Sequence, residues 1–272
     1  MELVEHLDDP RLEPFRRRER QLTSRAQRRT PDGGGWFLAE GDLVVERALE
    51  AGLVPVALLC DADDAPPVAE RAAACGAQVL GATESLRRQV TALAVTLPVI
   101  GVFERPPPRS ADEVADSAQR LVALEAVDNP TNVGAIVRSA VALGWDALVV
   151  DRTSADPLAR RSVRASMGTV LGLPWARSTD LTALVTRRRE AGALTVALTP
   201  HHAAADLELL AEGLWAQPRP VVMVMGAERS GLTEPMLDAC EVSARIPMAE
   251  GVDSLNVAAA AAVAAYALTR PR

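Results

Sequence analysis

The sequence predicts an α/β protein of two domains, the larger of which is expected to hold a parallel sheet covered by helices on both faces. Short apolar runs alternate with helical stretches in the C-terminal half, and continuous apolar strands are typical of sheets buried on both sides. The triple proline within Arg105–Arg109 cannot continue a helix or a central strand. We therefore expect one domain at residues 1–104, a linker at 105–118 and a second domain at 119–272.

The N-terminal half shows the smaller α/β pattern. Strands are expected at Trp36–Leu38, Val54–Cys60, Ala77–Leu80 and Val99–Phe103, and helices at Asp42–Gly52, Pro67–Ala74 and Ser85–Ala92. Aspartate readily accepts backbone hydrogen bonds at a helix N-terminus, so Asp42 is expected to cap the first of these helices.

The C-terminal half alternates more regularly. Strands are expected at Leu121–Val127, Ala147–Val150, Ala193–Leu198, Val221–Met225 and Val242–Ile246, with helices near 133–143, 158–166, 180–191, 206–214 and 233–240 and a final helix from Ser254 to Thr269. Ligands of open α/β sheets bind outside the carboxyl ends of the strands. Functional residues are therefore expected directly after strands.

The composition fits a soluble protein with a substantial core, since 49% of the 272 residues are apolar and 24% are charged. A net charge of −7 excludes a surface that is positive throughout, but a local basic patch is compatible with nucleic-acid binding. The three scattered cysteines predict neither a zinc site nor a disulfide framework. The acidic N-terminus is unlike a signal peptide, and the longest apolar segment, Leu255–Leu268, is shorter than a bilayer span. We expect a cytoplasmic protein without metal or membrane contact.

The most basic segment holds eight arginines, at positions 11, 16, 17, 18, 20, 25, 28 and 29. An isolated run of this kind is more often a solvated helix face. The alternative is a surface that contacts RNA phosphates, for which the candidates are Arg16, Arg17, Arg18, Arg25 and Arg28.

The first motif, DNPTNVGAIVRSA, starts at Asp128, directly after a predicted strand. Asn-Pro favours a turn, and Asn132 is placed to cap the helix that follows. A capped turn explains these residues but explains Arg138 poorly. An arginine inside an apolar helical stretch either lies at the surface or is directed at an anion.

The second motif, GAERSGLT, starts at Gly226 after the strand at 221–225. It resembles the phosphate loop GxxxxGK[ST], but Leu232 stands where that loop needs its lysine. No GxGxxG follows a strand either, so neither a nucleotide triphosphatase nor an ordinary dinucleotide-binding turn is predicted. What remains is a glycine loop with one acid, Glu228, that lets the backbone approach a ligand closely.

The third motif, IPMAEGVDSLNVA, starts at Ile246 after the last strand. Pro247 ends strand pairing, and Ser254 or Asn256 can cap the last helix. That helix is apolar nearly all round, so it is expected to be buried on more than one side, either inside the monomer or at a subunit interface.

Together, NPTNVGAIVRSA, VMGAERSGL and IPMAEGVDSLNVAAAAA resemble, in order, spacing and position after strands, the signature motifs of the SpoU (TrmH-type) family of RNA ribose methyltransferases in the SPOUT superfamily. The resemblance covers about residues 119–270, and WFLAEGDLVVERALEAG is similar to the L30e-like RNA-binding domain that often precedes this catalytic domain. The resemblance implies methylation of a ribose 2′-hydroxyl in RNA, a C-terminal trefoil knot, and a homodimer through the C-terminal domain.

The resemblance also assigns site residues. The family's functional positions are occupied by Asn132, Arg138, Glu228, Ser254 and Asn256. S-adenosylmethionine would be bound in the knot, mostly by backbone groups at Leu198, Thr199, Gly226, Ile246, Met248 and Leu255. The segment Ala165–Gly168 resembles a family segment near the active site, without an assigned role.

Arg138 is the family's usual candidate for handling the ribose hydroxyl. A guanidinium loses its proton only above about pH 12, so we expect a charge-assisted contact with the substrate phosphate rather than simple base catalysis. Glu228 is expected to pair with Arg138 and to orient it.

Ribosomal RNA is the expected substrate, and transfer RNA is the alternative. Three competing interpretations are a catalytically idle RNA-binding protein of the same fold, a methyltransferase that acts on a base nitrogen, and an unrelated small-molecule enzyme. The intact motif residues disfavour the first, and the different motifs of base-methylating branches disfavour the second. The arginine run and the joint motif match disfavour the third.

Overall fold

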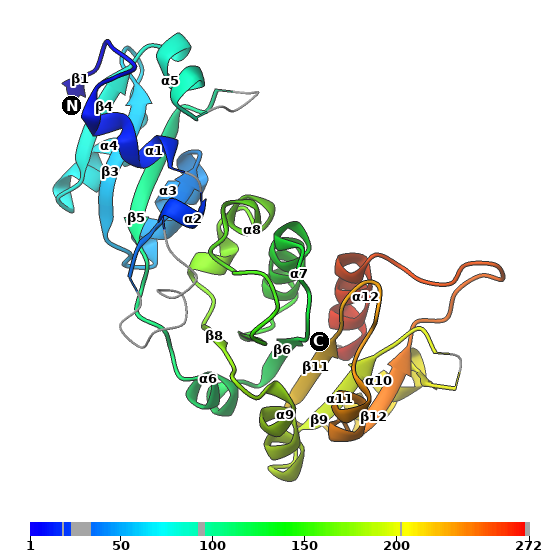
Figure 1. The fold of residues 1–272 in the computed structure, drawn as a ribbon. Helices are drawn as coiled ribbons and strands as arrows, with labels where there is room; N and C mark the ends of the chain where they lie inside the picture. The colour runs from blue at the N-terminus through cyan, green and yellow to red at the C-terminus, as the bar shows by residue number, and fades with distance from the viewer. Residues whose placement is uncertain (18, 23–33, 92–95, 202, 270–272) are drawn as a thin grey trace. The chain divides into compact units, whose positions relative to one another are not determined.

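The computed structural model describes the chain except for residues 18, 23–33, 92–95, 202 and 270–272. The chain forms two compact units (Figure 1). Unit 1 consists of Met1–Pro108 and Leu158–Gly172, and unit 2 consists of Arg109–Pro157 and Leu173–Arg272. The segment 158–172 therefore belongs to unit 1, although unit 2 precedes and follows it in the sequence.

Unit 1 contains a five-stranded sheet in the order β1-β4-β3-β5-β2. The strands are β1 (Glu2–Leu3), β2 (Trp36–Glu40), β3 (Pro55–Asp61), β4 (Gln78–Ala82) and β5 (Val99–Glu104). β5 runs antiparallel to β2 and β3, whereas β4 is parallel to β1 and β3. The four strands predicted for this half of the sequence are present, so its α/β character is confirmed.

Short helices accompany this sheet. They are η1 (Pro10–Leu12), α1 (Glu13–Arg16), α2 (Glu19–Leu22), α3 (Asp42–Glu50), α4 (Val68–Ala74), α5 (Glu84–Thr91), α8 (Arg160–Ala165) and η3 (Thr169–Leu171). The prediction that Asp42 caps α3 was wrong, because Gly41 holds the N-cap position and Asp42 is the first helical residue. The φ angle of Gly41 is 92°, a conformation that glycine adopts far more readily than any other residue.

Unit 2 contains a seven-stranded sheet in the order β10-β12-β9-β11-β6-β7-β8, and every neighbouring pair is parallel. The strands are β6 (Arg120–Leu124), β7 (Ala147–Val150), β8 (Trp175–Arg177), β9 (Leu194–Leu198), β10 (Ala205–Asp206), β11 (Val221–Met225) and β12 (Val242–Arg245). The predicted parallel sheet is confirmed. The two edge strands, β8 and β10, were not predicted, because segments of three and two residues are too short to show a pattern.

Helices cover both faces of this sheet (Figure 1). On one face, α6 (Ala111–Ser117), α9 (Leu181–Glu190) and α11 (Glu234–Ala239) bury apolar side chains in one core with the strands. On the other face, α12 (Val257–Thr269) packs against α7 (Pro130–Ala142), α10 (Leu207–Ala216) and β11. The indole N–H groups of Trp145 and Trp215 donate to the carbonyls of Ala265 and Ala267 in α12. The expected burial of this helix on more than one side is confirmed.

The expected linker at 105–118 differs from the structure. The residues 105–110 are neither helix nor strand, but α6 follows at once, with Val114 and Ala115 buried in the core of unit 2. The Oγ of Ser110 caps this helix by accepting a hydrogen bond from the N–H of Glu113 at 3.4 Å. The segment after the prolines is thus part of the second unit rather than a connection.

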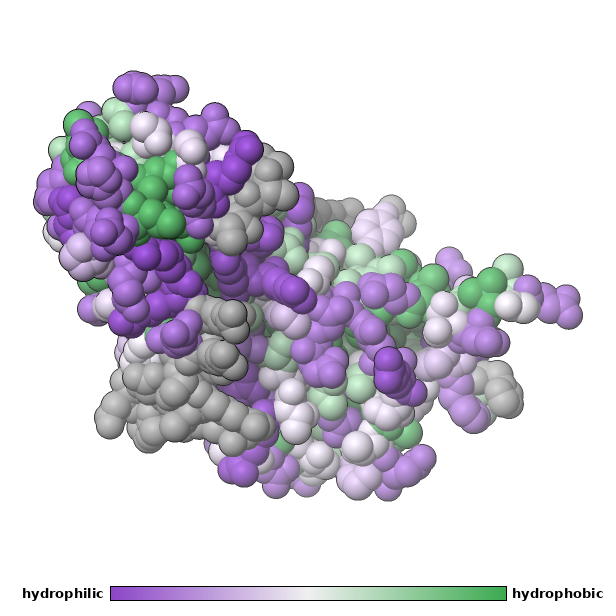
Figure 2. Space-filling model, turned by 45° about the horizontal axis from the view of Figure 1, so that its top comes forward, coloured by the Kyte–Doolittle hydropathy of each residue, from purple (hydrophilic) through white to green (hydrophobic). Residues whose placement is uncertain are grey.

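Apolar side chains remain exposed before and along α12. Val252, Leu255, Val263 and Tyr266 are each between 42% and 49% exposed. Figure 2 shows apolar surface, in green, on the segment that projects at the right, which Figure 1 identifies as the loop that leads into α12. We refer to these four residues as the α12 strip. Within the described ranges, no helix is both long and apolar enough to cross a membrane.

Candidate active site

The three motifs meet at one edge of the unit 2 sheet. The first follows β6, the second follows β11 and the third follows β12, while β9 lies between β11 and β12. Because these strands are parallel, their carboxyl ends share one edge, which is where ligands of open α/β sheets bind. One side-chain contact joins the first motif to the third, and another joins the second motif to the residue that follows β6.

The first contact is made by Asn132. Asn129, rather than Asn132, caps α7, since its side chain accepts a hydrogen bond from the N–H of Thr131 at 3.0 Å. The predicted capping role of Asn132 was therefore wrong: Pro130 occupies the first helical position and sets the helix start earlier. Asn132 is buried in the first turn, and its Oδ1 accepts a hydrogen bond from Nδ2 of Asn256 at 3.4 Å. This buried amide ties the first motif to the third.

Asn256 has a second task in the third motif. Its Oδ1 accepts hydrogen bonds from the N–H groups of Ala258 at 2.9 Å and Ala259 at 3.3 Å, so it caps α12 as predicted. The amide thus uses its oxygen for the helix and its nitrogen for Asn132, which fixes its orientation. Ser254, the other candidate, lies exposed in the preceding loop and makes no hydrogen bond with the described residues.

The second contact fixes the glycine loop after β11. The N–H of Gly231 donates to the carbonyl of Ala227 at 2.9 Å, so the loop closes on itself. A Cβ atom on Gly226 would lie 2.4 Å from the carbonyl carbon of Gly231, which leaves no room for any side chain. The N–H and Oγ1 of Thr233 then donate to the Glu125 carboxylate at 2.9 and 2.8 Å. Glu125, which the sequence analysis missed, follows β6 and so joins the second motif to the strand before the first.

The turn after Glu125 is strained and firmly held. Ala126 has a φ of 56°, in the left-handed region that costs an L-residue roughly 1–2 kcal/mol. Its N–H donates to Oδ1 of Asp151 at 3.1 Å, and the next N–H, of Val127, donates to Oγ of Ser154 at 3.0 Å. Burial raises the pKa of Asp151, but hydrogen bonds from Ser154, Thr153 and two backbone N–H groups outweigh this and hold the pKa below its usual 3.8. A charged Asp151 therefore helps to fix the approach to the first motif.

Replacing Asp151 with asparagine is expected to lower the free energy of unfolding by about 2 kcal/mol at pH 7, because an amide oxygen accepts these hydrogen bonds more weakly than a carboxylate does. The folded pKa lies below the unfolded one, so this stability is fully present above the unfolded pKa and is lost as the pH falls through the folded pKa. Urea unfolding at pH 7 and pH 3 measures the effect. The gap between wild type and variant should narrow at pH 3, and an equal gap at both values would contradict the role. Asp112→Asn, which removes an exposed ion pair with Arg187, is the control and should cost less than about 1 kcal/mol.

Arg138 and Glu228 are both exposed, and neither makes a hydrogen bond or an ion pair with any residue that the structure describes. The predicted pair between them is therefore wrong. An exposed pair gains little free energy from contact in water, so nothing compels these side chains to meet. Among the described residues, the guanidinium group of Arg138 therefore has no protein partner.

The six residues predicted to bind the cofactor follow three neighbouring strands or precede α12. Leu198 ends β9, Gly226 follows β11 and Ile246 follows β12. The N–H of Thr199 donates to the carbonyl of Ala244 at 3.0 Å, which keeps the ends of β9 and β12 together. Leu198, Ile246 and Met248 are half-buried, and Leu255 is exposed in the loop before α12. Apolar side chains beside backbone polar groups form the kind of surface that suits an adenine ring.

Arg245 adds a charged group that the sequence analysis missed. It is the last residue of β12, and its Nε is buried without a hydrogen-bond partner in the described part of the chain. Buried polar groups are normally paired, and an acceptor on a bound ligand would satisfy this donor. A carboxylate such as that of S-adenosylmethionine fits this need, as the apolar edge fits its adenine.

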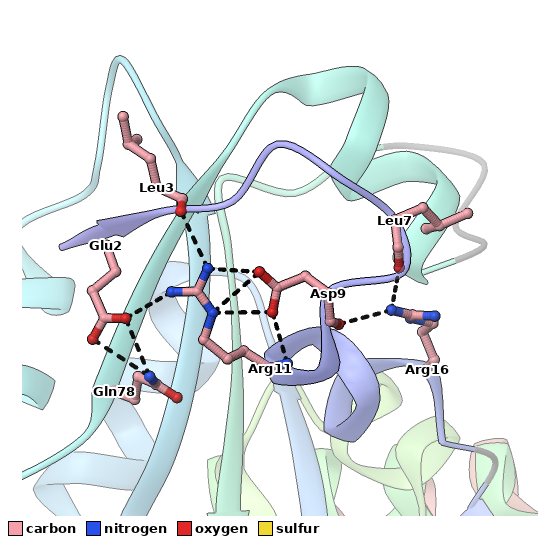
Figure 3. Close-up of polar contacts among 7 residues, drawn as sticks. All are labelled: Glu2, Leu3, Leu7, Asp9, Arg11, Arg16 and Gln78. Atoms are coloured by element: carbon pink, nitrogen blue, oxygen red, sulfur yellow. Dashed lines mark hydrogen bonds and ion pairs between the residues drawn. The ribbon is translucent and has the colours of Figure 1, made fainter.

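Two of the arginines predicted to contact RNA are engaged within unit 1. Arg16 donates to the carbonyls of Leu7 and, at 3.1 Å, of Asp9 (Figure 3). Arg17 donates to Glu13 at 2.8 Å and lies 5.1 Å from the centre of the Trp36 ring. Arg18, Arg25 and Arg28 lie outside the described residues, so RNA contact by this group of five stays a prediction.

Arg11, at the start of the basic run, is structural. Its guanidinium contacts the carboxylates of Asp9 at 2.6 Å and Glu2 at 2.7 Å and the carbonyl of Leu3 (Figure 3). The side-chain hydrogen bonds from Arg11 lower the pKa of Asp9 to about 2. Arg11 therefore holds the N-terminal segment in place. Its role is structural and does not require contact with RNA.

Comparison with known proteins identifies the family. The model of the SpoU rRNA Methylase family matches residues 119–266. An uncharacterized tRNA/rRNA methyltransferase of Mycobacterium tuberculosis is 37% identical over 97% of this chain and 90% of its own length. The 23S rRNA (guanosine(2553)-2′-O)-methyltransferase RlmP of Bacillus subtilis is 27% identical over 85% of this chain and 88% of its own length.

Solved structures agree with the sequence relatives. The AdoMet-bound rRNA methyltransferase of Sinorhizobium meliloti superimposes with a TM-score of 0.80 at 28% identity, covering 98% of this chain and 97% of that one. The AdoMet complex of the SpoU methyltransferase AviRb of Streptomyces viridochromogenes gives 0.76 at 26% identity, covering 96% and 97%. With its motifs gathered at one sheet edge and the family model matched over more than half its length, the chain belongs to the SpoU rRNA methylase family.

Proposed function

We propose that this protein is an S-adenosylmethionine-dependent RNA methyltransferase that methylates a ribose 2′-hydroxyl, and that its substrate is ribosomal RNA. The observation that carries the proposal is a pair of contacts at the carboxyl edge of the unit 2 sheet: Asn132–Asn256 joins the first motif to the third, and Glu125–Thr233 joins the second motif to the end of β6. RlmP, a relative over most of the chain, is named as a 23S rRNA 2′-O-methyltransferase, which supports both the acceptor and the substrate.

S-adenosylmethionine would be held by Leu198, Thr199, Gly226, Ile246, Met248 and Leu255, with Arg245 toward its carboxylate. When bound, it supplies an electrophilic methyl group. AdoMet in two similar solved structures supports this cofactor. The family's trefoil knot would bring these loops together around it. We expect no metal to take part.

The chain's own residues would position the ribose. Arg138 would contact a substrate phosphate through charge-assisted hydrogen bonds and so fix the 2′-oxygen near the reactive methyl group. The hydroxyl proton would pass to that phosphate or to water, because the guanidinium stays charged at neutral pH. Asn132 and Asn256 would hold the first turn of α7 and the start of α12 in register, while the exposed Glu228 and Ser254 would contact the RNA or the cofactor.

Unit 1 would act as an L30e-like RNA-binding domain, and unit 2 would form a homodimer. The α12 strip supports the dimer, because four exposed apolar residues near one helix are favourable to bury against a second copy. Analytical ultracentrifugation at micromolar concentration checks this: a mass of about twice 28.8 kDa is expected, and a monomer would contradict it.

The function is tested by mapping methylation in RNA from cells with and without the gene. Digestion of each RNA to nucleosides followed by mass spectrometry is expected to show one 2′-O-methylnucleoside lost from ribosomal RNA. Loss from transfer RNA instead would move the substrate to the alternative class. Loss of a base-methylated nucleoside, or no loss combined with no methyl transfer by the purified protein, would overturn the proposal.

A further inference from the structure

The helix α8 carries positive charge into unit 1. It reads RRSVRA, and the whole segment 158–172 contains three arginines and no acidic residue. Although this segment lies between β7 and β8 in the sequence, it clusters with unit 1 and packs beside β2. It also contains the Ala165–Gly168 segment that the sequence analysis left without a role.

One buried carboxylate anchors the helix. The side chain of Glu40, at the end of β2, is 3% exposed. Each of its two oxygens contacts a different arginine: Oε1 lies 2.5 Å from Nη2 of Arg160, and Oε2 lies 2.5 Å from Nη2 of Arg164. The two arginines are four residues apart and so lie on one side of the helix. Since one negative charge faces two positive ones, the anchor itself leaves an excess of positive charge.

The turn after α8 is locked as well. Gly168 has a φ of 80°, and a Cβ there would lie 3.2 Å from Cγ1 of Val44 in α3, so the turn packs closely against that helix. Arg47 of α3 donates to the carbonyl of Met167, which itself has a φ of 52°. The buried Oγ of Ser166 donates to the carbonyl of Val163 at 3.0 Å. Both ends of α8 are thus fixed, and a fixed helix can present side chains with little loss of entropy on binding.

Beside this anchor, Arg161 has no acidic partner among the described residues, and Arg164 shares the single Glu40 carboxylate with Arg160. Arg161 is exposed and has no partner in the parts of the chain that the structure describes, and the side chain of Arg164 is 51% exposed. Arg47 binds a carbonyl, which carries no charge. Its own helix α3 also holds Asp42, Glu46 and Glu50, of which Glu46 is paired with Arg71 at 2.8 Å. The positive charge is therefore concentrated on α8.

The edge strand β2 connects this charge with the N-terminal arginines. Trp36, at the start of β2, lies under the guanidinium of Arg17, and Glu40, at its end, holds Arg160 and Arg164. Four residue steps along a strand span about 13 Å. Arginines therefore lie at both ends of one edge strand. Phosphate groups along a single RNA strand could contact the arginines at both ends.

We propose that α8, through Arg161 and Arg164, is a phosphate-binding element for RNA that acts together with Arg17 along β2. The guanidinium fork matches phosphate oxygens, and several fixed arginines with few acids suit a polyanion better than a single anion. The inference rests on the proposed function only in taking RNA as the partner. It assigns Ala165–Gly168 the role of holding α8 on unit 1.

The test is binding of the full-length protein to a fluorescent 20-nucleotide oligo(U) RNA, without cofactor, across a series of salt concentrations. Arg161→Ala is expected to weaken binding about five-fold at 100 mM salt and to reduce the slope of log K against log salt by about 0.7, and Arg161→Glu should weaken it further. Arg161 is exposed and has no partner among the residues that the structure describes, so neither substitution should affect folding. Arg187→Ala, which removes an exposed arginine from α9 in unit 2, is the control and should bind as the wild type does.

Wild-type affinity and slope for Arg161→Ala would overturn the inference, as would an equal loss in Arg187→Ala, because net charge alone would then explain the binding. If Arg161→Ala bound RNA as the wild type does but no longer bound to a column of immobilised acidic protein, α8 would be assigned to a protein partner instead. A wild-type protein that methylates RNA while Arg161→Ala binds oligo(U) normally refutes this inference alone. If the wild-type protein transfers no methyl group but Arg161→Ala still binds oligo(U) more weakly than the wild type does, only the proposed function is refuted.

Discussion

Replacing Gly226 with alanine is expected to abolish measurable binding of S-adenosylmethionine and to lower the free energy of unfolding by about 3 kcal/mol. The new Cβ would lie 2.4 Å from the carbonyl carbon of Gly231, 2.5 Å from its oxygen and 2.5 Å from the N of Leu232. All three atoms are backbone, so no side chain can rotate away. The loop must open, and the hydrogen bond from Gly231 to Ala227 is lost with it.

Isothermal titration calorimetry with the cofactor, together with urea unfolding, measures both effects. Gly213→Ala in α10 is the matched control, because a Cβ there meets open space, and it should bind the cofactor normally. From the sequence, the glycine loop was expected to let the backbone approach a ligand closely. In the structure, a side chain at Gly226 clashes with the backbone of the loop itself. Even the methyl group of alanine should therefore be enough to disrupt the loop and cofactor binding. Normal affinity in Gly226→Ala would refute the placement of this loop at the cofactor.

The sheet edge that carries the site could be predicted from the sequence because its strands are buried on both faces. Val221–Met225 is apolar at every position, a pattern that is typical of strands in parallel sheets. Once the strands are parallel, the motifs that follow them must share an edge. The edge strands β8 and β10 escaped prediction, since two or three residues show neither run nor alternation.

The contacts within the site could not be predicted in the same way. Asn132 was expected to serve its own helix, but its partner, Asn256, lies 124 positions away. Glu125 lay inside the predicted strand Leu121–Val127, and its importance depends on Thr233, 108 positions away. The segment 158–172 belongs to unit 1 through contacts with distant residues, namely the ion pairs with Glu40 and the packing of its turn against α3. Such long-range pairings depend on tertiary packing, which local patterns do not encode.

Replacing Arg138 with alanine is expected to lower the rate of methyl transfer by about 100- to 1,000-fold, the usual loss when one positioned charged or hydrogen-bonding group is removed from a transition state. Stability and cofactor affinity should stay unchanged, because Arg138 is exposed and has no partner among the described residues. Single-turnover transfer of a labelled methyl group, cofactor titration and urea unfolding separate these quantities. Arg187→Ala again serves as the exposed control and should retain full activity.

Arg138→Lys distinguishes a charged clamp from a base. A lysine keeps the charge but loses the planar fork, so the clamp predicts partial activity, with most of the loss in the rate of transfer. It also predicts a flat pH profile for the wild type between pH 7 and 9, since the guanidinium remains charged throughout. A base with a lowered pKa would instead give a rate that rises ten-fold per pH unit below that pKa. If Arg138→Lys were as inactive as Arg138→Ala and the wild-type rate rose with pH in this way, the clamp would be excluded and a neutral guanidine would have to act as the base. Retained activity in Arg138→Ala would remove Arg138 from the site altogether.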